Sequence, residues 1–366
     1  MKRSIMCAAA AGMLLAAGVG FAAGKPRVEV AFVLDSTGSM GGLIEGAKQK
    51  IWSIANSIIA QKPTPEVRIG LITYRDRGDE YVTKRFDLTD DIDTVFRNLQ
   101  SFAADGGGDD PESVNQALHE AVTDFSWTAD RKVLKIIFLV GDYPPHMDYA
   151  RDVSYIVTCK EAVTRNLIID TVQCGEVGDT TRVWQDIARR AEGSYVALAQ
   201  SGNMTVIATP FDDDIARAST EIGTTMVAYG ERERQEEARG KVAKAALAPV
   251  SVAADRAAYN LASGGKAIQG AGDLVAAVTE GVVDVAKLRD EELPPEMKKM
   301  NAAERKAYIG RQQEKRESLN KKLMGLTQKR ADYIAKEEKR LAAAGTGDSF
   351  DAKVTEIIAV QAARLP

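Results

Sequence analysis

Oxygen-bearing side chains follow two apolar segments, at points where buried strands would end. The apolar run 28–34 leads into Asp35-Ser36-Thr37-Gly38-Ser39, which places a carboxylate and two hydroxyls at alternate positions of a short loop. The apolar run 133–140 leads into Gly141-Asp142, and a third segment, 106–112, is rich in glycine and carboxylates. These donors are all hard oxygens, which suit Mg²⁺, Mn²⁺ or Ca²⁺ better than zinc or copper.

The elements that must position these loops alternate between strand and helix. Strands are predicted at 28–34, 67–74, 81–88, 133–140, 167–172 and 195–198, and helices at 43–59, 91–102, 111–125, 149–164, 182–191 and 212–229. Apolar strands separated by helical patterns predict an α/β fold with a parallel sheet covered by helices on both faces. The polar, alternating segment 81–88 is typical of an edge strand. Ligands of such sheets bind outside the carboxyl ends of the strands, where the three loops can converge.

The Asp35-x-Thr37-x-Ser39 loop after a buried strand, with Asp142 ending the central strand, resembles the von Willebrand factor type A domain and its metal-ion-dependent adhesion site. The family's site combines an Asp-x-Ser-x-Ser loop with a threonine from a second loop and an aspartate from a third. The resemblance covers about residues 28–229. It implies a doubly wound, mostly parallel, Rossmann-like sheet with one antiparallel edge strand, followed here by an α-helical C-terminal region.

The resemblance also implies a set of metal ligands and a cofactor. The ligands are Asp35, Thr37, Ser39, Asp109 and Asp142, and the cofactor is Mg²⁺, with Mn²⁺ or Ca²⁺ as alternatives. Thr37 stands where the family has serine and keeps the hydroxyl. Asp109 stands where threonine is usual, and Asp110 is the alternative for that position.

Each candidate also has a structural interpretation. Asp35 and Ser39 could simply cap a helix, and Asp109 and Asp110 could be turn residues. We expect Glu112 to lie in the first turn of a helix or to cap it, with a role as a base beside the metal as the alternative. His146 is expected to be an ordinary loop residue, although it could contact a ligand at the rim.

The first 24 residues have the features of a secretory signal. Lys2 and Arg3 precede an apolar stretch at 5–21 and small residues suited to cleavage after Ala22 or Gly24. An uncleaved membrane anchor is the alternative; no later segment has the length of a membrane span. We therefore expect an exported protein, periplasmic or secreted. In that oxidising environment Cys159 and Cys174 could pair, but their predicted places on a helix and a strand favour two buried thiols.

The last third differs in composition. We predict a signal peptide at 1–24, a type A domain at 25–230, an Ala/Gly-rich helical linker region at 231–300, and a long charged helix with a terminal helix at 301–366. Asn301 and Glu304 form a capping-box pattern, and an apolar seam is expected at Leu319, Leu323, Leu326, Tyr333 and Leu341. The segment 291–340 has 14 basic and 9 acidic residues, so its face is either solvated or a docking or coiled-coil surface.

The composition and the absence of enzyme motifs exclude several classes of function. The chain has 366 residues, 45% of them hydrophobic, and a formal net charge of −4, so no global basic footprint for nucleic acid exists. Neither a nucleotide-binding P-loop nor a G-x-S-x-G elbow is present, and we expect no enzyme. The leading hypothesis is an exported, metal-dependent module that binds an unidentified protein ligand. The alternative is a structural envelope scaffold in which the helical tail makes the interactions and the metal only stabilises the fold. The oligomeric state stays open.

Overall fold

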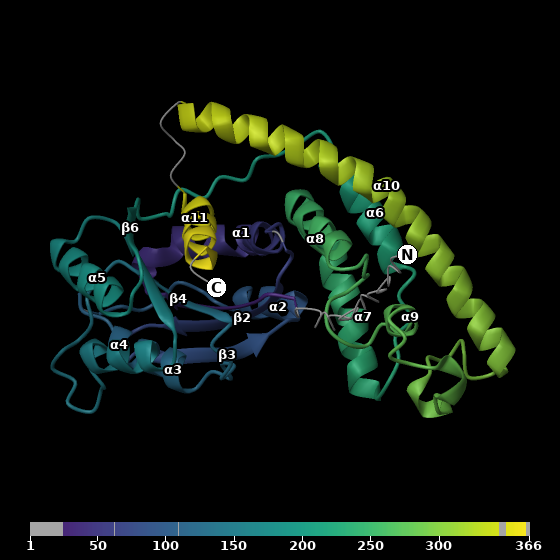
Figure 1. Cartoon of the computed structure of the whole chain (residues 1–366), viewed down its shortest axis with the longest axis horizontal. Helices are drawn as coiled ribbons and strands as arrows, with labels where there is room; N and C mark the ends of the chain where they lie inside the picture. Colours follow the sequence, from purple (N-terminus) through teal and green to yellow (C-terminus); the bar gives the residue numbers. More distant parts are fainter. Residues whose placement is uncertain (1–24, 62, 109, 344–348, 364–366) are drawn as a thin grey trace, which may run out of the picture.

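A six-stranded sheet forms the centre of the first half of the chain (Figure 1). The structure is a computed structural model that describes residues 25–61, 63–108, 110–343 and 349–363. The strand order is β3-β2-β1-β4-β5-β6, and every neighbouring pair is parallel except β2 with β3, which is antiparallel. The strands are β1 (Arg27–Asp35), β2 (Glu66–Tyr74), β3 (Thr83–Thr89), β4 (Leu134–Gly141), β5 (Ile168–Cys174) and β6 (Tyr195–Leu198). The sheet confirms the predicted fold class, including the antiparallel edge strand.

Both faces of the sheet are covered by helices, as the apolar strands require. Along β1, Val30 and Phe32 point into one core, and Ala31 and Val33 point into the other. The first core is completed by α1 (Gly41–Ile59), α2 (Ile92–Leu99), α8 (Val250–Ala262) and α11 (Phe350–Ala362), and the second by α3 (Val114–Thr123), α4 (Tyr155–Thr164) and α5 (Gly178–Arg190). The alternation of side chains along a strand therefore divides the hydrophobic core into two layers.

The sheet has one point where the direction of winding changes. β1 lies between β2 and β4, and Leu34 is in register with Val140 although about a hundred residues separate them. The chain leaves β1 toward α1 on one face and leaves β4 toward α4 on the other face. Such a switch point opens a crevice at the carboxyl ends of the two strands, and ligands of doubly wound sheets bind there.

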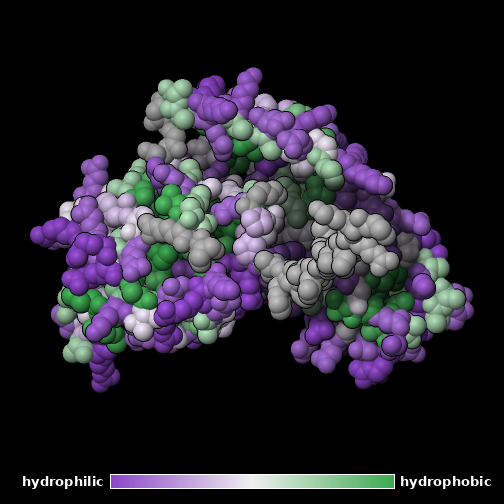
Figure 2. Space-filling view, in the orientation of Figure 1, coloured by the Kyte–Doolittle hydropathy of each residue, from purple (hydrophilic) through white to green (hydrophobic). Residues whose placement is uncertain are grey.

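The remaining helices pack in smaller apolar clusters of their own. They are α6 (Asp212–Gly223), α7 (Arg232–Ala246), α9 (Leu274–Thr279) and α10 (Ala302–Ala343), with short 3₁₀ turns at Gly38–Met40, Val285–Lys287 and Asp290–Glu292. Apolar side chains of α6, α8 and α10, among them Ile222, Ala254 and Leu323, pack together. α10 lies along α6 and α8 as a long arm across the upper part of the view (Figure 1), and hydrophilic residues cover much of its outer side (Figure 2).

The contact face of α10 differs from the predicted apolar seam. Its buried residues are Ile309, Arg316, Leu323 and Arg330, at seven-residue intervals. Leu323 is buried, and Leu319 and Leu326 pack against the same cluster, which confirms part of the seam, whereas Tyr333 is exposed. The two arginines are buried because each meets aspartates. Arg316 pairs with Asp273 at 2.6 Å, and Arg330 pairs with Asp212 at 2.7 Å and Asp255 at 2.6 Å. A contact face predicted from apolar residues alone omits arginines that are buried because they form ion pairs with aspartates.

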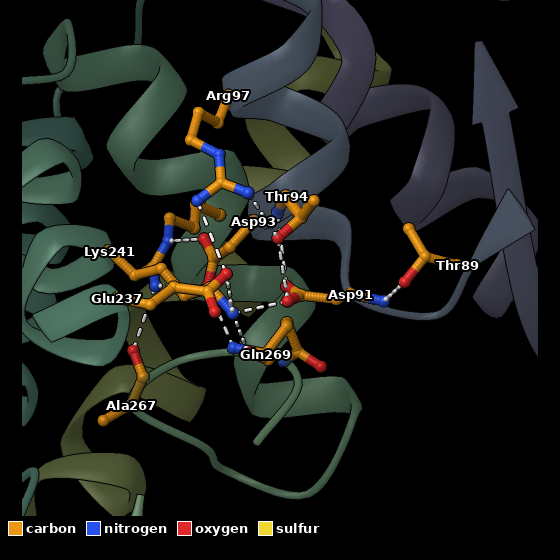
Figure 3. A network of polar contacts seen from close by, with 10 residues as sticks. Thr89, Asp91, Asp93, Thr94, Arg97, Glu237, Lys241, Ala267 and Gln269 are labelled. Atoms are coloured by element: carbon orange, nitrogen blue, oxygen red, sulfur yellow. Dashed lines mark hydrogen bonds and ion pairs between the residues drawn. The ribbon is translucent and has the colours of Figure 1, made fainter. Parts of the chain in front are cut away.

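A polar network fastens the helical region to α2 of the sheet domain (Figure 3). Asp93 accepts hydrogen bonds from Arg256 Nε and Nη2 at 2.7 and 2.9 Å and from the backbone N–H of Gln269 at 2.8 Å. Beside it, Asp91 pairs with Lys241 of α7. Since Asp93 and Arg256 are both buried, removal of either partner leaves an uncompensated buried charge.

The final helix returns to the sheet. Phe350 packs against Phe32 of β1 with ring centroids 6.3 Å apart, and Val354 and Ile358 are fully buried in the same core. The N–H of Phe350 donates to the carbonyl of Gly202, in the loop after β6, at 2.9 Å. The sheet's packing thus draws on residues far beyond 230, although the division of the chain into domains stays a prediction.

The cysteines and the start of α10 agree with the sequence prediction. Cys159 and Cys174 are free and buried, which confirms two thiols without a disulfide. The capping box of α10 is present, because Asn301 and Glu304 exchange side-chain to backbone hydrogen bonds at 2.8 and 3.0 Å. The predicted signal at 1–24 lies outside the described residues. Among the helices of the described ranges, none has both the length and the apolar character that crossing a membrane requires.

Candidate metal centre

The Asp35–Ser39 loop holds its first carboxylate in a fixed orientation at the end of β1. Asp35 is fully buried, and its Oδ1 accepts hydrogen bonds from the backbone N–H of Thr37 at 2.8 Å and from Thr37 Oγ1 at 2.7 Å. Thr37 Oγ1 lies 3.3 Å from Ser39 Oγ, so the alternate positions share one side of the loop as predicted. The second carboxylate oxygen, Asp35 Oδ2, is buried and has no hydrogen-bond partner.

Asp142 supplies a second buried carboxylate from the end of β4. Its Oδ2 accepts a hydrogen bond from Gln200 Nε2 at 2.7 Å, whereas its Oδ1 is buried without a partner. Gly141 permits the close approach of the two strand ends, because an added Cβ would lie 3.2 Å from Asp35 Oδ2 and 2.3 Å from Tyr74 Oη. Burial and the adjacent charge of Asp142 raise the pKa of Asp35 to about 8.

The glycine-rich loop lies directly over these residues. The N–H of Gly38 donates to the carbonyl of Gly106 at 3.2 Å, and the N–H of Asp105 donates to the carbonyl of Ser36 at 3.0 Å. Gly107 has φ +81°, and a Cβ there would lie 3.2 Å from Thr37 Cβ and 3.4 Å from Glu112 Oε1. Glycine is therefore needed both for the backbone conformation and for the contact.

The structure does not test the predicted second-loop ligand. Asp109 lies outside the described residues, so its assignment stays a prediction. Asp110, the alternative, has an exposed side chain and belongs to the outer surface of the loop. The described part of the loop instead buries a carboxylate that the sequence predicts in a helical turn.

Glu112 is that carboxylate, and it was predicted wrongly as a capping or first-turn residue. The helix begins only at Val114, because the segment before it pairs with the loop after β4. The N–H of Glu112 donates to the carbonyl of Pro144 at 3.0 Å, and the N–H of His146 donates to the carbonyl of Glu112 at 3.0 Å. This extended pairing turns the Glu112 side chain inward, where it is 2% exposed and its Oε2 has no partner.

The pKa of Glu112 is raised for the same reasons as the pKa of Asp35. Burial raises its pKa to about 9, and the charges of Asp35, Asp76 and Asp142 add to the effect. A signal for this position exists in the sequence. The apolar period of the helix starts at Val114, so Glu112 precedes the helix and belongs to the loop.

A second polar cluster supports the rim beside Glu112. Asp76 accepts hydrogen bonds from Ser113 Oγ and from Tyr149 Oη, both at 2.8 Å. The His146 ring stacks on Tyr149 with centroids 4.0 Å apart, and Arg77 covers Tyr149 at 3.9 Å. His146, expected to be an ordinary loop residue, is 8% exposed and has a structural place in this rim.

The donor chemistry of the site fits a hard divalent cation. Three carboxylate oxygens, on Asp35, Asp142 and Glu112, are buried without partners, and the hydroxyls of Thr37 and Ser39 lie beside Asp35. Within the described residues, no three His, Cys, Asp or Glu side chains are close enough together to form a ready-made metal cluster. An ion would therefore be held partly by the hydroxyls and by water, as is usual for Mg²⁺.

The comparison with protein families agrees with the sheet and its loops. The family model described as von Willebrand factor A domain matches residues 29–210. The chain is a von Willebrand factor A domain protein. The match confirms the resemblance drawn from the motif, and it ends in the loop after β6, so it leaves the helical region undescribed.

Individual relatives of this von Willebrand factor A domain are distant. The ariadne-like RING finger protein R811 of Acanthamoeba polyphaga mimivirus is 26% identical over 201 residues, which are 50% of this chain and 19% of that protein. The chain thus spans about a fifth of the length of this curated relative.

Solved structures are also similar only at a distance. The SpRpn10 VWA domain is 17% identical, with a TM-score of 0.37, over 50% of this chain and 100% of that chain. Mussel byssus proximal thread matrix protein 1 with a zinc-occupied MIDAS motif is 14% identical, with a TM-score of 0.36, over 48% and 42%. An aerotolerance-related membrane protein of Bacteroides fragilis is 16% identical, with a TM-score of 0.35, over 48% and 92%. Likenesses of this size carry no information about ligand or role.

Proposed function

We propose that this chain is a metal-dependent interaction module. Its von Willebrand factor A domain would hold a divalent cation, Mg²⁺ or in its place Mn²⁺ or Ca²⁺, through Asp35, Thr37, Ser39 and Asp142. One observation carries the proposal: two buried carboxylates from the ends of β1 and β4 each keep an oxygen without a partner at the switch point of the sheet. Two unpaired like charges in a buried site are unfavourable unless a cation or protons compensate them.

The residues of such a metal site have different roles. Asp35 is oriented by Thr37, and Asp142 is oriented by Gln200, so each carboxylate has one oxygen fixed and one available. Ser39 is exposed and marks the side that faces solvent, where a partner would approach. A bound cation supplies positive charge and an open coordination position that a partner's oxygen can fill.

The proposal assigns binding rather than catalysis. Burial raises the pKa of Cys159 to about 12 and holds that of Cys174 still further above its usual range, so neither thiol is an available nucleophile at neutral pH. We further propose that residues 1–24 direct export to the periplasm or the exterior. Asp109 remains a proposed ligand from the second loop.

A capture experiment tests the proposal and its alternative. The purified chain serves as bait for an envelope extract of the source cells, once with Mg²⁺ and once with EDTA, beside the Asp35→Asn variant. We expect a set of proteins captured in Mg²⁺ and lost both in EDTA and with Asp35→Asn. Asp110→Asn, which removes an exposed carboxylate of the same rim, should capture the same set as the parent.

The alternative predicts a different pattern. α10 exposes most of its surface and has only four buried residues, so the tail could make the interactions of an envelope scaffold. Capture that persists in EDTA and with Asp35→Asn would support that scaffold role and contradict a metal-dependent module.

A further inference from the structure

We infer that Glu112 contributes its carboxylate to the bound cation, so that the second loop supplies a charged donor instead of a neutral hydroxyl. The inference rests on the proposed metal site and adds to it a residue that the motif does not contain. It concerns a residue whose side chain is described, whereas the motif-based candidate Asp109 is not.

The first argument is the place of Glu112 in the chain. Its backbone is fixed on both sides by the loop that starts at Asp142, through the hydrogen bonds to Pro144 and from His146. The carboxylate is therefore attached to the same rigid edge as the β4 aspartate. A side chain held by paired backbone is a better-defined donor than one on a free loop.

The second argument is the surroundings of the carboxylate. A Cβ at Gly107 would touch both Thr37 Cβ and Glu112 Oε1, so the Glu112 carboxylate and the Thr37 side chain flank the same glycine. Thr37 is the hydroxyl residue that also binds Asp35. Glu112 thus faces the Asp35–Ser39 loop and not solvent.

The Glu112 carboxylate also has a buried oxygen atom, Oε2, without a hydrogen-bond partner. Glu112 is 2% exposed, and its Oε2 is buried with no hydrogen-bond donor in reach. Buried carboxylate oxygens are normally paired, because an unpaired one loses its hydration without compensation. Asp35 Oδ2 and Asp142 Oδ1 have the same deficit. Because the three carboxylates do not form a ready-made cluster in the described residues, an ion held by Asp35 and Asp142 would reach Glu112 through a water.

The charge balance follows directly. Three carboxylates around one divalent ion give a formal local charge of about −1, from +2 and −3, where two carboxylates give about 0. Glu112 should therefore strengthen cation binding. One bridging water would link the carboxylate to the ion, as is usual for Mg²⁺.

The test compares two substitutions by calorimetric titration of the chelator-stripped, full-length chain with Mn²⁺ and Mg²⁺. Glu112→Gln keeps the shape and removes the charge, and we expect it to weaken binding of the metal about tenfold or more. Asp110→Asn removes an exposed carboxylate two residues away and should stay within about threefold of the parent, because exposed charges are screened. In EDTA, Glu112→Gln should melt at the same temperature as the parent or higher, since Glu112 Oε2 has no hydrogen-bond partner to lose.

The outcomes separate the inference from the proposed function. Equal affinities for Glu112→Gln and Asp110→Asn, in a parent that binds metal, would overturn the role of Glu112 alone. Absence of binding in the parent would overturn the proposed function. If Glu112→Gln fails to fold, Glu112→Thr, which also removes the charge and keeps a polar side chain, should show the same loss of affinity. Parent-like affinity there would also overturn the inference.

Discussion

Asp35→Asn should abolish the thermal stabilisation that Mg²⁺ or Mn²⁺ gives to this chain. In the parent, metal at about a hundred times its dissociation constant should add about 2.7 kcal/mol to the free energy of unfolding. For a domain of this size that corresponds to a rise in melting temperature of about 5–10 °C. Asparagine can still accept the hydrogen bonds from Thr37, so the variant loses the charge with little change in the loop.

Melting curves in millimolar metal and in EDTA measure this effect. Asp105→Asn is the matched control, because Asp105 is an exposed carboxylate of the neighbouring loop and should keep the full response. A parent whose melting temperature is the same with metal and with EDTA would contradict the assignment of Asp35.

Arg256→Met should destabilise the protein by about 3–5 kcal/mol. Arg256 donates two hydrogen bonds to Asp93 and one to the carbonyl of Ala267, all in a buried setting. Methionine fills a similar space but leaves the carboxylate of Asp93 in the core with only the Gln269 N–H as a partner. The effect should appear in urea denaturation followed by circular dichroism.

Arg97→Met is the control from the same network. Arg97 contacts Glu237 at 3.4 Å, but both side chains are more than a third exposed, so its loss should cost less than about 1 kcal/mol. Equal destabilisation by the two substitutions would show that the buried pair does not hold the helical region to α2.

The sheet and two of its loops could be predicted because their signals are local. β1 and β4 are apolar along their length, since both of their faces are covered, and the run ends abruptly at the oxygen-bearing residues. The residues Asp35, Thr37 and Ser39 are neighbours in sequence, and Asp142 follows the other strand at the switch point. Strand ends in a parallel sheet meet at one edge, so these positions converge without knowledge of the packing.

Glu112 could not be placed with the same ease because its position depends on contacts between distant segments. A glutamate one residue after a proline is typical of a helix start. Here the backbone of Glu112 pairs with Pro144 and His146, more than thirty residues away, and that pairing keeps the segment extended. That pairing is made by the tertiary structure, and the only local signal is that the apolar period of the helix starts at Val114.

The seam of the helical tail was predicted in part, since Leu319, Leu323 and Leu326 pack in one apolar cluster. The apolar residues of α10 predicted a seam, but Arg316 and Arg330 take positions of the contact face because aspartates of other helices meet them. The return of α11 to the sheet, with Phe350 beside Phe32, likewise joins residues more than three hundred positions apart. Periodicity gives the helices and their length, whereas their partners follow only from the fold.

We expect the carboxyl edge of this sheet to bind one divalent cation. Calorimetric titration of the chelator-stripped chain with Mn²⁺ tests it most directly, with Asp142→Asn measured alongside. Saturable binding of about one ion per chain is expected in the parent, with a large loss of affinity in the variant. No saturable binding at millimolar metal, or binding that Asp142→Asn leaves unchanged, would contradict it.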